Sequence, residues 1–286
     1  KECNILNNLA DCYSKMRKNE QAIEFIERIV PEYKKREEFE YLANSYGNLG
    51  NAYKNMGQLT NALEYYNKSS ALCVKTGLHL SQAQNLIIMT DIFNQMGLVE
   101  DAEFNLNKLE DLVDSLNNEL VYGRYKSALS RMHSNLNDTD KAINLIEEAI
   151  QHCQNANNNA LVVRYLLDLS FMMIQVDRLS DSKSKIDLAL TLLENRYRNP
   201  GLEFLAQCYL SLLDIKENNS NKMIKDLLNE IEDNNVEAFK VISFGFKELK
   251  DIDNFSKYSQ KWNDFILESS KNISDNNQKN SFLKLN

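Results

Sequence analysis

Residues 46–66 contain Tyr46-Gly-Asn-Leu-Gly-Asn-Ala-Tyr53, then Met56-Gly57, and then Ala62-Leu-Glu-Tyr-Tyr66. The distinctive small and large side chains of this stretch recur mainly three or four residues apart, a spacing that places them on one face of a helix. The stretch therefore predicts two amphipathic helices, one to about Met56 and one from about Leu59, joined by Gly57-Gln58. Small residues are expected where the two helices cross closely, and tyrosines fill the space beside the crossing.

The same unit recurs with a period of forty residues. Its most regular position holds Ala22, Ala62, Ala102, Ala142 and Ser182. Each of these small residues lies early in an apolar helical pattern, after a short polar break. A fixed period of this length predicts a solenoid of stacked helix pairs. Beyond Pro200 the register weakens, and the last pair, rich in large aromatic side chains, is interpreted as a capping repeat.

The pattern of residues 46–66 resembles the tetratricopeptide repeat, in the forty-residue form seen in kinesin light chains. The resemblance implies an all-α, right-handed α-solenoid of about seven helix-turn-helix repeats in one continuous superhelix. The expected repeats span residues 1–35, 36–77, 78–117, 118–157, 158–197, 198–234 and 235–270, followed by a polar tail over 271–286.

Composition limits the functional classes. The 286 residues carry a formal net charge of −8 and show no clustered basic face, so we expect no nucleic-acid partner. No apolar run is long enough for a membrane span, and we expect a cytoplasmic protein. The five cysteines form no Cys-x-x-Cys pair, which indicates buried free thiols rather than metal ligands or disulfides. Asparagine clusters such as 155–159 are interpreted as inter-helix turns, because asparagine accepts left-handed backbone conformations.

Chemistry-bearing patterns are absent from the sequence. His133 occupies the position held by Tyr13, Tyr53 and Phe93 in other repeats, so we expect a packed histidine. No phosphate-binding glycine loop occurs, and no histidine has a second histidine or a cysteine four residues away on the same helical face. We therefore expect no enzyme activity, no cofactor and no metal.

In tetratricopeptide arrays the first helix of each pair lines a concave groove that contacts ligands. The resemblance therefore implies that polar positions on those helices form a peptide-binding groove. Asparagine amides both donate and accept, so a row of them can hold the backbone of an extended peptide. Arg124, Arg131 and Arg164 are expected to lie close together and to pair with a carboxylate-bearing ligand. A solvated face with no ligand would have similar composition. The predicted groove positions are Asn4, Asn8, Asp11, Lys15, Asn44, Asn48, Asn51, Lys54, Asn55, Gln84, Asp91, Asn94, Gln95, Arg124, Arg131, Asn135, Arg164 and Gln175.

Three functions remain open from the sequence. The first is a non-catalytic scaffold that binds a peptide or protein segment. The second is the regulatory or sensor region of a larger signalling protein, such as a kinase, ATPase, cyclase or transcription regulator. This second hypothesis rests on residues 273–275 and 281–283, which resemble the C-terminal end of tetratricopeptide regions attached to bacterial signalling proteins. The start at Lys1, directly in a helical pattern, also suggests part of a longer protein. The third is a self-association module, a homodimer through chain ends that expose Ile5, Leu9 and Ile23.

Overall fold

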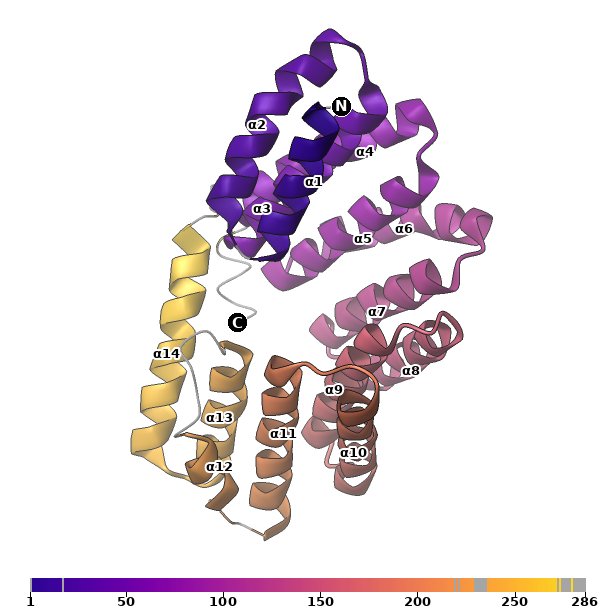
Figure 1. Ribbon diagram of the computed structural model, residues 1–286. Helices are drawn as coiled ribbons and strands as arrows, with labels where there is room; N and C mark the ends of the chain where they lie inside the picture. Colours follow the sequence, from indigo (N-terminus) through magenta and orange to yellow (C-terminus); the bar gives the residue numbers. More distant parts are fainter. Residues whose placement is uncertain are drawn as a thin grey trace. The chain divides into compact units, whose positions relative to one another are not determined.

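Helices account for all of the regular secondary structure in the part of the chain that the computed structural model describes, which is residues 2–16, 18–218, 220, 222–228, 236–271, 273 and 279. They follow one another in antiparallel pairs joined by short turns (Figure 1). Their bounds are α1 Glu2–Lys15, α2 Asn19–Lys35, α3 Phe39–Asn55, α4 Leu59–Thr76, α5 His79–Met96, α6 Val99–Leu116, α7 Glu119–Asn135, α8 Thr139–Asn155, α9 Asn159–Gln175, α10 Leu179–Asn195, α11 Pro200–Asn218, α12 Lys222–Leu227, α13 Val236–Glu248 and α14 Ile252–Lys271. The prediction of an all-α repeat fold is confirmed.

The contacts between helices divide the chain into two units. Unit 1 comprises Lys1–Val121 and Glu268–Asn286, and unit 2 comprises Tyr122–Leu267. In unit 1, each helix from α1 to α5 packs against the next one along the chain, and α1 also packs against α3. In unit 2, α9 and α13 both pack against α11. First helices of neighbouring repeats therefore lie side by side within each unit, as a solenoid requires.

The helix pair predicted from residues 46–66 is present with its turn in the predicted place. Helix α3 ends at Asn55 and α4 begins at Leu59. The division into seven repeats and a tail stays a prediction. Most of the proposed tail, 271–286, lies outside the described residues.

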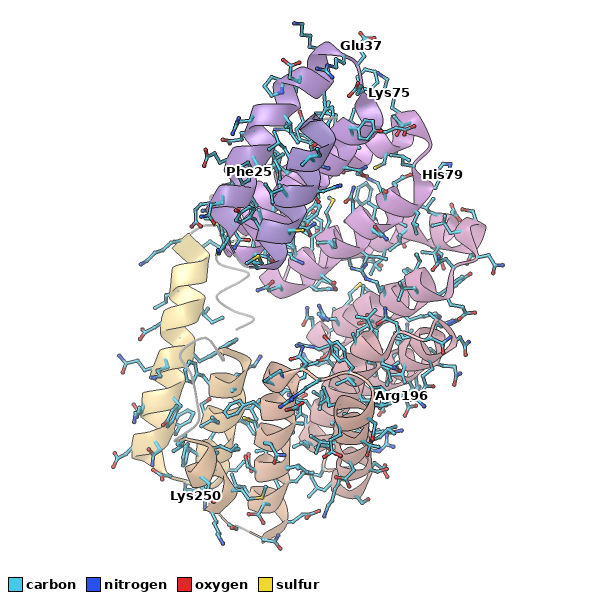
Figure 2. All side chains as sticks on the ribbon, in the orientation of Figure 1. Phe25, Glu37, Lys75, His79, Arg196 and Lys250 are labelled. Atoms are coloured by element: carbon cyan, nitrogen blue, oxygen red, sulfur yellow. The ribbon has the colours of Figure 1, made fainter. Side chains whose placement is uncertain are left out.

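Left-handed turn residues recur every twenty positions. The residues with positive φ include Gly57, Gly77 and Gly97, and between residues 37 and 177 the other positions of the series are Glu37, Asn117, Asn137, Asn157 and Asp177. Glycine and asparagine tolerate this backbone region better than other residues. The interpretation of the 155–159 cluster as a turn is confirmed, since Asn157 has φ 54°. Figure 2 labels Glu37 and Lys250, two turn residues that adopt positive φ without being glycine or asparagine.

The small-residue positions are the places of closest helix contact. Ala22, Ala62, Ala102, Ala142 and Ser182 are all fully buried. A Cβ atom added to Gly50 would lie 2.9 Å from ring atoms of Tyr66. The Ser182 hydroxyl donates to the carbonyl oxygen of Ser170 at 3.0 Å, across the α9–α10 pair. Side chains larger than these would force the helices apart.

Candidate ligand-binding surface

Three asparagines of α3 occupy one face of that helix. Asn44, Asn48 and Asn51 follow one another at spacings of four and three residues, so their side chains line up along one face. They border a hollow of about 310 Å³ in unit 1, which we call the asparagine hollow. Its lining residues are Asn7, Asn8, Ala43, Asn44, Gly47, Asn48, Asn51, Tyr66, Ser69, Ser81, Gln84, Asn85 and Ile88.

Hydrogen bonds fix the orientation of two of these amides. The Tyr66 hydroxyl donates to Asn51 Oδ1 at 2.8 Å. Asn48 Nδ2 donates to Asn7 Oδ1 at 3.3 Å. Among the described residues, no partner engages Asn51 Nδ2 or Asn48 Oδ1. One helical turn therefore presents a donor and an acceptor to the asparagine hollow.

A second set of polar contacts builds the floor of the asparagine hollow. Asn85 Nδ2 donates to Ser69 Oγ at 2.8 Å, and the Ser69 hydroxyl donates to the carbonyl oxygen of Ala43 at 2.7 Å. Asn85 is 7% exposed, so its amide is held by the protein rather than by solvent. This chain of bonds ties α3, α4 and α5 together within the lining that also contains Asn44, Asn48 and Asn51.

The predicted groove residues of unit 1 divide between the asparagine hollow and the packing around it. Asn8 and Gln84 join the α3 asparagines in the lining. Asn55 Nδ2 instead lies 3.3 Å from Ser14 Oγ and 3.4 Å from Asn19 Oδ1, a bridge between α1, α2 and α3. The side chain of Asp11, a predicted groove residue, lies outside the described residues, as do those of Asn4 and Lys15.

Three further predicted groove residues, Asn94, Lys54 and Asp91, are buried or half-buried. Asn94 is 1% exposed, so its side chain is buried in this structure, and its predicted place in a ligand site stays a prediction. Lys54 and Asp91 are half-buried and do not line the asparagine hollow.

A second hollow, of about 290 Å³, lies within unit 2, and we call it the arginine hollow. Three of its residues are basic and one is acidic. The Arg164 guanidinium Nε lies 3.2 Å from Asp168 Oδ1. The rings of Phe171 and Tyr209 stack with centroids 5.4 Å apart and an interplanar angle of 17°. The lining consists of Ser127, Ser130, Arg131, Ser134, Ile146, Arg164, Asp168, Phe171, Met172, Gln175, Tyr209 and Lys240.

The arginine hollow contains two of the three predicted arginines. Arg131 and Arg164 share the arginine hollow, but Arg124 is not part of its lining. Arg124 instead lies close enough to Cys153 to act on its thiol. Burial raises the pKa of Cys153 to about 11, and the positive charge of Arg124 opposes part of that rise. The register placed all three on first helices but did not show that the charge of Arg124 acts on the Cys153 thiol of α8.

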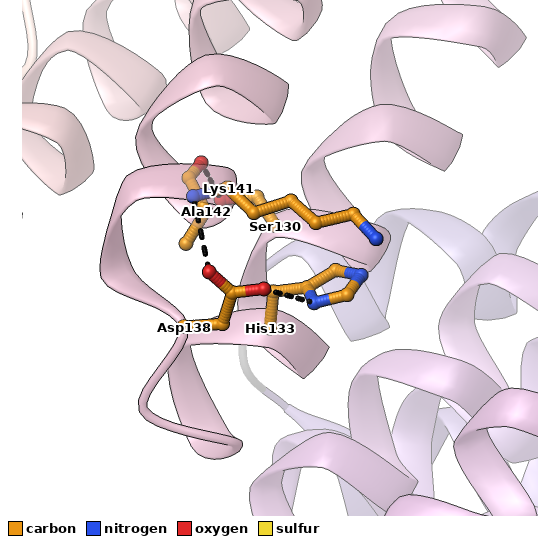
Figure 3. A network of polar contacts seen from close by, with 5 residues as sticks. All are labelled: Ser130, His133, Asp138, Lys141 and Ala142. Atoms are coloured by element: carbon orange, nitrogen blue, oxygen red, sulfur yellow. Dashed lines mark hydrogen bonds and ion pairs between the residues drawn. The ribbon is translucent and has the colours of Figure 1, made fainter.

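His133 contributes to the α7–α8 turn. Its Nδ1 lies 3.4 Å from Asp138 Oδ2, while Asp138 Oδ1 accepts a bond from the Lys141 backbone N–H at 3.4 Å (Figure 3). The Ser130 hydroxyl, one turn earlier on α7, donates to the carbonyl oxygen of Ala142 at 2.7 Å. His133 is mostly buried, with 13% of its side chain exposed. This arrangement fits the expectation of a packed histidine at the end of α7.

No described helix is both long and apolar enough to cross a membrane. The described histidine, cysteine, aspartate and glutamate side chains form no group of three that could hold a metal ion.

Several lining residues were missed by sequence reasoning. Asn7 and Asn85 lie on first helices next to predicted positions, and a wider window on the same face would have found them. Tyr66 was assigned to packing alone, and nothing in its spacing shows that its hydroxyl reaches Asn51. Lys240 comes from α13, where the forty-residue register has decayed, so no periodic signal links it to Arg131.

Comparison with known proteins identifies the fold. The sequence profile of the 26S proteasome subunit RPN7 matches residues 10–130. No curated protein sequence matches the chain. The structure is similar to that of a Rap protein complexed with Competence and Sporulation Factor, with a TM-score of 0.79, 10% identity, and coverage of 95% of this chain and 76% of that chain.

Two other solved structures have a similar fold. One is the Rap conjugation gene regulator of plasmid pLS20 in complex with the Phr* peptide, with a TM-score of 0.74 and 14% identity. The alignment covers 93% of this chain and 75% of the regulator chain. A signal transduction ATPase of Pyrococcus horikoshii with a tetratricopeptide repeat sensor has a TM-score of 0.61 at 15% identity, over 98% of this chain and 38% of its own. At these identities the similarity establishes the fold, which is that of a tetratricopeptide-like helical repeat protein.

Proposed function

We propose that the asparagine hollow binds an extended segment of a peptide or protein and that the chain is a non-catalytic interaction module. The observation that carries the proposal is the fixed pair of amide groups on α3. Asn51 Nδ2 is a donor and Asn48 Oδ1 an acceptor, one helical turn apart, and each is oriented by a bond on its other side.

A peptide backbone fits this pair chemically. Every residue other than proline offers one N–H donor and one C=O acceptor, so the carbonyl would accept from Asn51 and the N–H would donate to Asn48. Such contacts hold the backbone whatever its side chains. Asn8, Asn44 and Gln84 extend the same polar surface over α1, α3 and α5, which suits a segment of several residues.

The structural relatives support a peptide or protein as the partner class. The Rap regulator of plasmid pLS20 was solved in complex with the Phr* peptide. Its fold is shared over nearly the whole of this chain, although few residues are identical, so the sequence of the bound segment is expected to differ.

Selection from a random peptide library displayed on phage tests the proposal. Peptides that bind the wild-type chain should lose at least about tenfold in affinity for Asn48→Ala/Asn51→Ala, because two oriented hydrogen bonds disappear. Asn67→Ala/Asn107→Ala is the matched control, since both of its asparagines are exposed on second helices. Equal loss in both variants, or no loss in either, would remove the asparagine hollow as the binding site.

A sensor region within a larger signalling protein is the second candidate. It is favoured by the similarity to the Pyrococcus horikoshii ATPase, in which a tetratricopeptide sensor belongs to a longer chain. Under this function, a peptide that binds the asparagine hollow would change the activity of an attached domain. Measuring that activity in the full-length protein, with and without the selected peptide, separates a sensor from a simple scaffold.

Self-association through α1 is a third candidate. Ile5 and Leu9 of α1 are 67% and 37% exposed, and Met16, directly after α1, is 62% exposed, so this part of the chain presents apolar side chains to solvent. Sedimentation equilibrium of the wild-type chain and of Ile5→Ser/Met16→Ser tests it. A dimer that the substitutions dissociate supports the candidate, and a monomer in both samples removes it.

A further inference from the structure

The arginine hollow has an unusual charge for this protein. The whole chain carries a net charge of −8, yet the arginine hollow is lined by Arg131, Arg164 and Lys240 against Asp168 as its one carboxylate. The lining thus has a net charge of three minus one, or +2, concentrated around about 290 Å³. A concave site with this local charge attracts anions.

One wall of the arginine hollow is apolar. Phe171 and Met172 are half-buried, and Tyr209, stacked on Phe171, is 6% exposed. The stacked pair is held between α9 and α11, which contact each other. An apolar group of a ligand therefore meets a rigid wall rather than a mobile side chain.

We infer that the arginine hollow binds a carboxylate carried on an apolar side chain, with the carboxylate at Arg131 and Arg164 and the apolar group against Phe171 and Met172. Guanidinium groups match a carboxylate in shape and donate two parallel hydrogen bonds to it. A volume of about 290 Å³ accommodates one such residue but not a long segment. This site is separate from the asparagine hollow and shares no residue with it.

The apolar wall selects among anions. Phosphate carries no apolar group and gains nothing from Phe171 and Met172, whereas a carboxylate on an apolar side chain gains burial of that group in addition to the ion pair. The same chemistry is shared by a free aryl or alkyl carboxylic acid and by the C-terminal residue of a peptide. The two sources differ in the amide group next to the carboxylate.

Binding of small probes to the full chain tests the inference. Isothermal titration calorimetry compares N-acetylphenylalanine with its C-terminal amide, with 3-phenylpropionate, with acetate and with inorganic phosphate. N-acetylphenylalanine is expected to bind at least about tenfold more tightly than its amide, because only the acid carries the charge. Tighter binding than 3-phenylpropionate identifies a peptide C-terminus as the source, and equal binding identifies a free acid. Equal binding of acid and amide, or stronger binding of phosphate, overturns the inference.

Variants of Arg164 locate the site. Arg164→Gln should weaken N-acetylphenylalanine binding about tenfold, while Arg164→Lys, which keeps the charge, should lose less. Arg178→Gln is the matched control, since Arg178 pairs with Asp181 at 2.8 Å on the surface of the same unit and does not line the arginine hollow. An equal effect of Arg178→Gln would mean nonspecific charge attraction and would refute the site. Asn48→Ala/Asn51→Ala should leave this binding unchanged, so failure of the peptide proposal and failure of this one give different results.

Discussion

Tyr66 reaches from the interior of the second helix pair to Asn51 and donates its hydroxyl hydrogen to Oδ1 at 2.8 Å. Tyr66 is only 1% exposed, whereas Asn51 borders the asparagine hollow. One side chain therefore fills the space beside the α3–α4 crossing and also sets the direction of a half-buried amide in the lining of the asparagine hollow. Packing and ligand recognition are linked at this residue.

Removing the Tyr66 hydroxyl should separate these two roles. Tyr66→Phe keeps the ring packing and loses one hydrogen bond, so the free energy of unfolding is expected to fall by about 1 kcal/mol. Binding of a library-selected peptide is expected to weaken severalfold, because Asn51 can then rotate. Urea denaturation and fluorescence anisotropy measure the two effects. Tyr41→Phe is the control, since Tyr41 is 43% exposed and should change neither quantity. Unchanged peptide binding in Tyr66→Phe would contradict the positioning role.

Close packing at Gly50 makes a second prediction. A methyl group at this position would lie 2.9 Å from three atoms of the Tyr66 ring, and overpacking of this kind costs about 1–3 kcal/mol. Gly50→Ala should lower the thermal midpoint accordingly. Gly47→Ala on the same helix meets Ser69 Oγ at an ordinary 3.5 Å. It should stabilise the chain by about 0.5–1 kcal/mol, because alanine favours a helix over glycine. Midpoints that move in the same direction would argue against this packing.

Most of the fold could be predicted from the sequence, and the close contact at Gly50 illustrates the physical reason. Close helix crossings accept only small side chains, so Gly50, Ala62 and their equivalents leave a periodic trace that reveals the helix pairs. The trace fades after Pro200, where packing relies on large aromatic residues that fill space in many ways.

The binding surface was less predictable, because helical register gives the face of a residue but not its partners. Asn48 and Asn51, two of the predicted groove residues, line the asparagine hollow, and their contact with a ligand stays a prediction. Asn94 has the same residue type and a groove register, yet it is buried, since neighbouring side chains rather than its own identity decide exposure. Lys240 lies far along the chain from Arg131, and no local pattern connects them.

Thiol reactivity should follow burial. Burial raises the pKa of Cys208 to about 12 and that of Cys153 to about 11, whereas Cys12 is exposed. In a Cys3→Ser background at pH 8, Ellman's reagent should label Cys12 quickly in the native chain. Cys73, Cys153 and Cys208 should react only after unfolding in guanidinium. Rapid reaction of all four thiols without denaturant would show that these thiols are not protected by burial.

The same thiols predict a pH dependence of stability. Unfolded cysteines lose their proton at about pH 8.5, while Cys153 and Cys208 keep theirs in the folded chain up to about pH 11 and 12. Above about pH 8.5 the folded state therefore binds more protons than the unfolded state, and the free energy of unfolding falls as pH rises. Urea titrations at pH 8 and pH 10 measure the loss, which should be smaller in Cys208→Ala than in the wild-type chain. An identical loss in both would exclude Cys208 as a source.

Backbone strain at Glu37 offers a stabilising change. Glu37 has φ 54°, a conformation that costs about 1 kcal/mol or more for a residue with a Cβ. Glu37→Gly should therefore raise the free energy of unfolding by about 0.5–1 kcal/mol. At the next residue, Glu38, φ is −79°, so Glu38→Gly gains nothing from relief of strain and should lower stability slightly. Differential scanning calorimetry of the two variants should show opposite shifts, and matching shifts would rule out strain as the cause.

The regular spacing of the left-handed turns has a consequence for how such a chain changes during evolution. Turn residues at 37, 57, 77 and onward to 177 keep the same interval. Removing or duplicating any forty consecutive residues in this region therefore rejoins turn to turn and small residue to small residue. The surface formed by the first helices can lengthen or shorten by whole forty-residue units, while each remaining helix still packs against an equivalent neighbour. A protein built in this way can acquire a ligand of different length by recombination alone, before any side chain in the binding surface is altered.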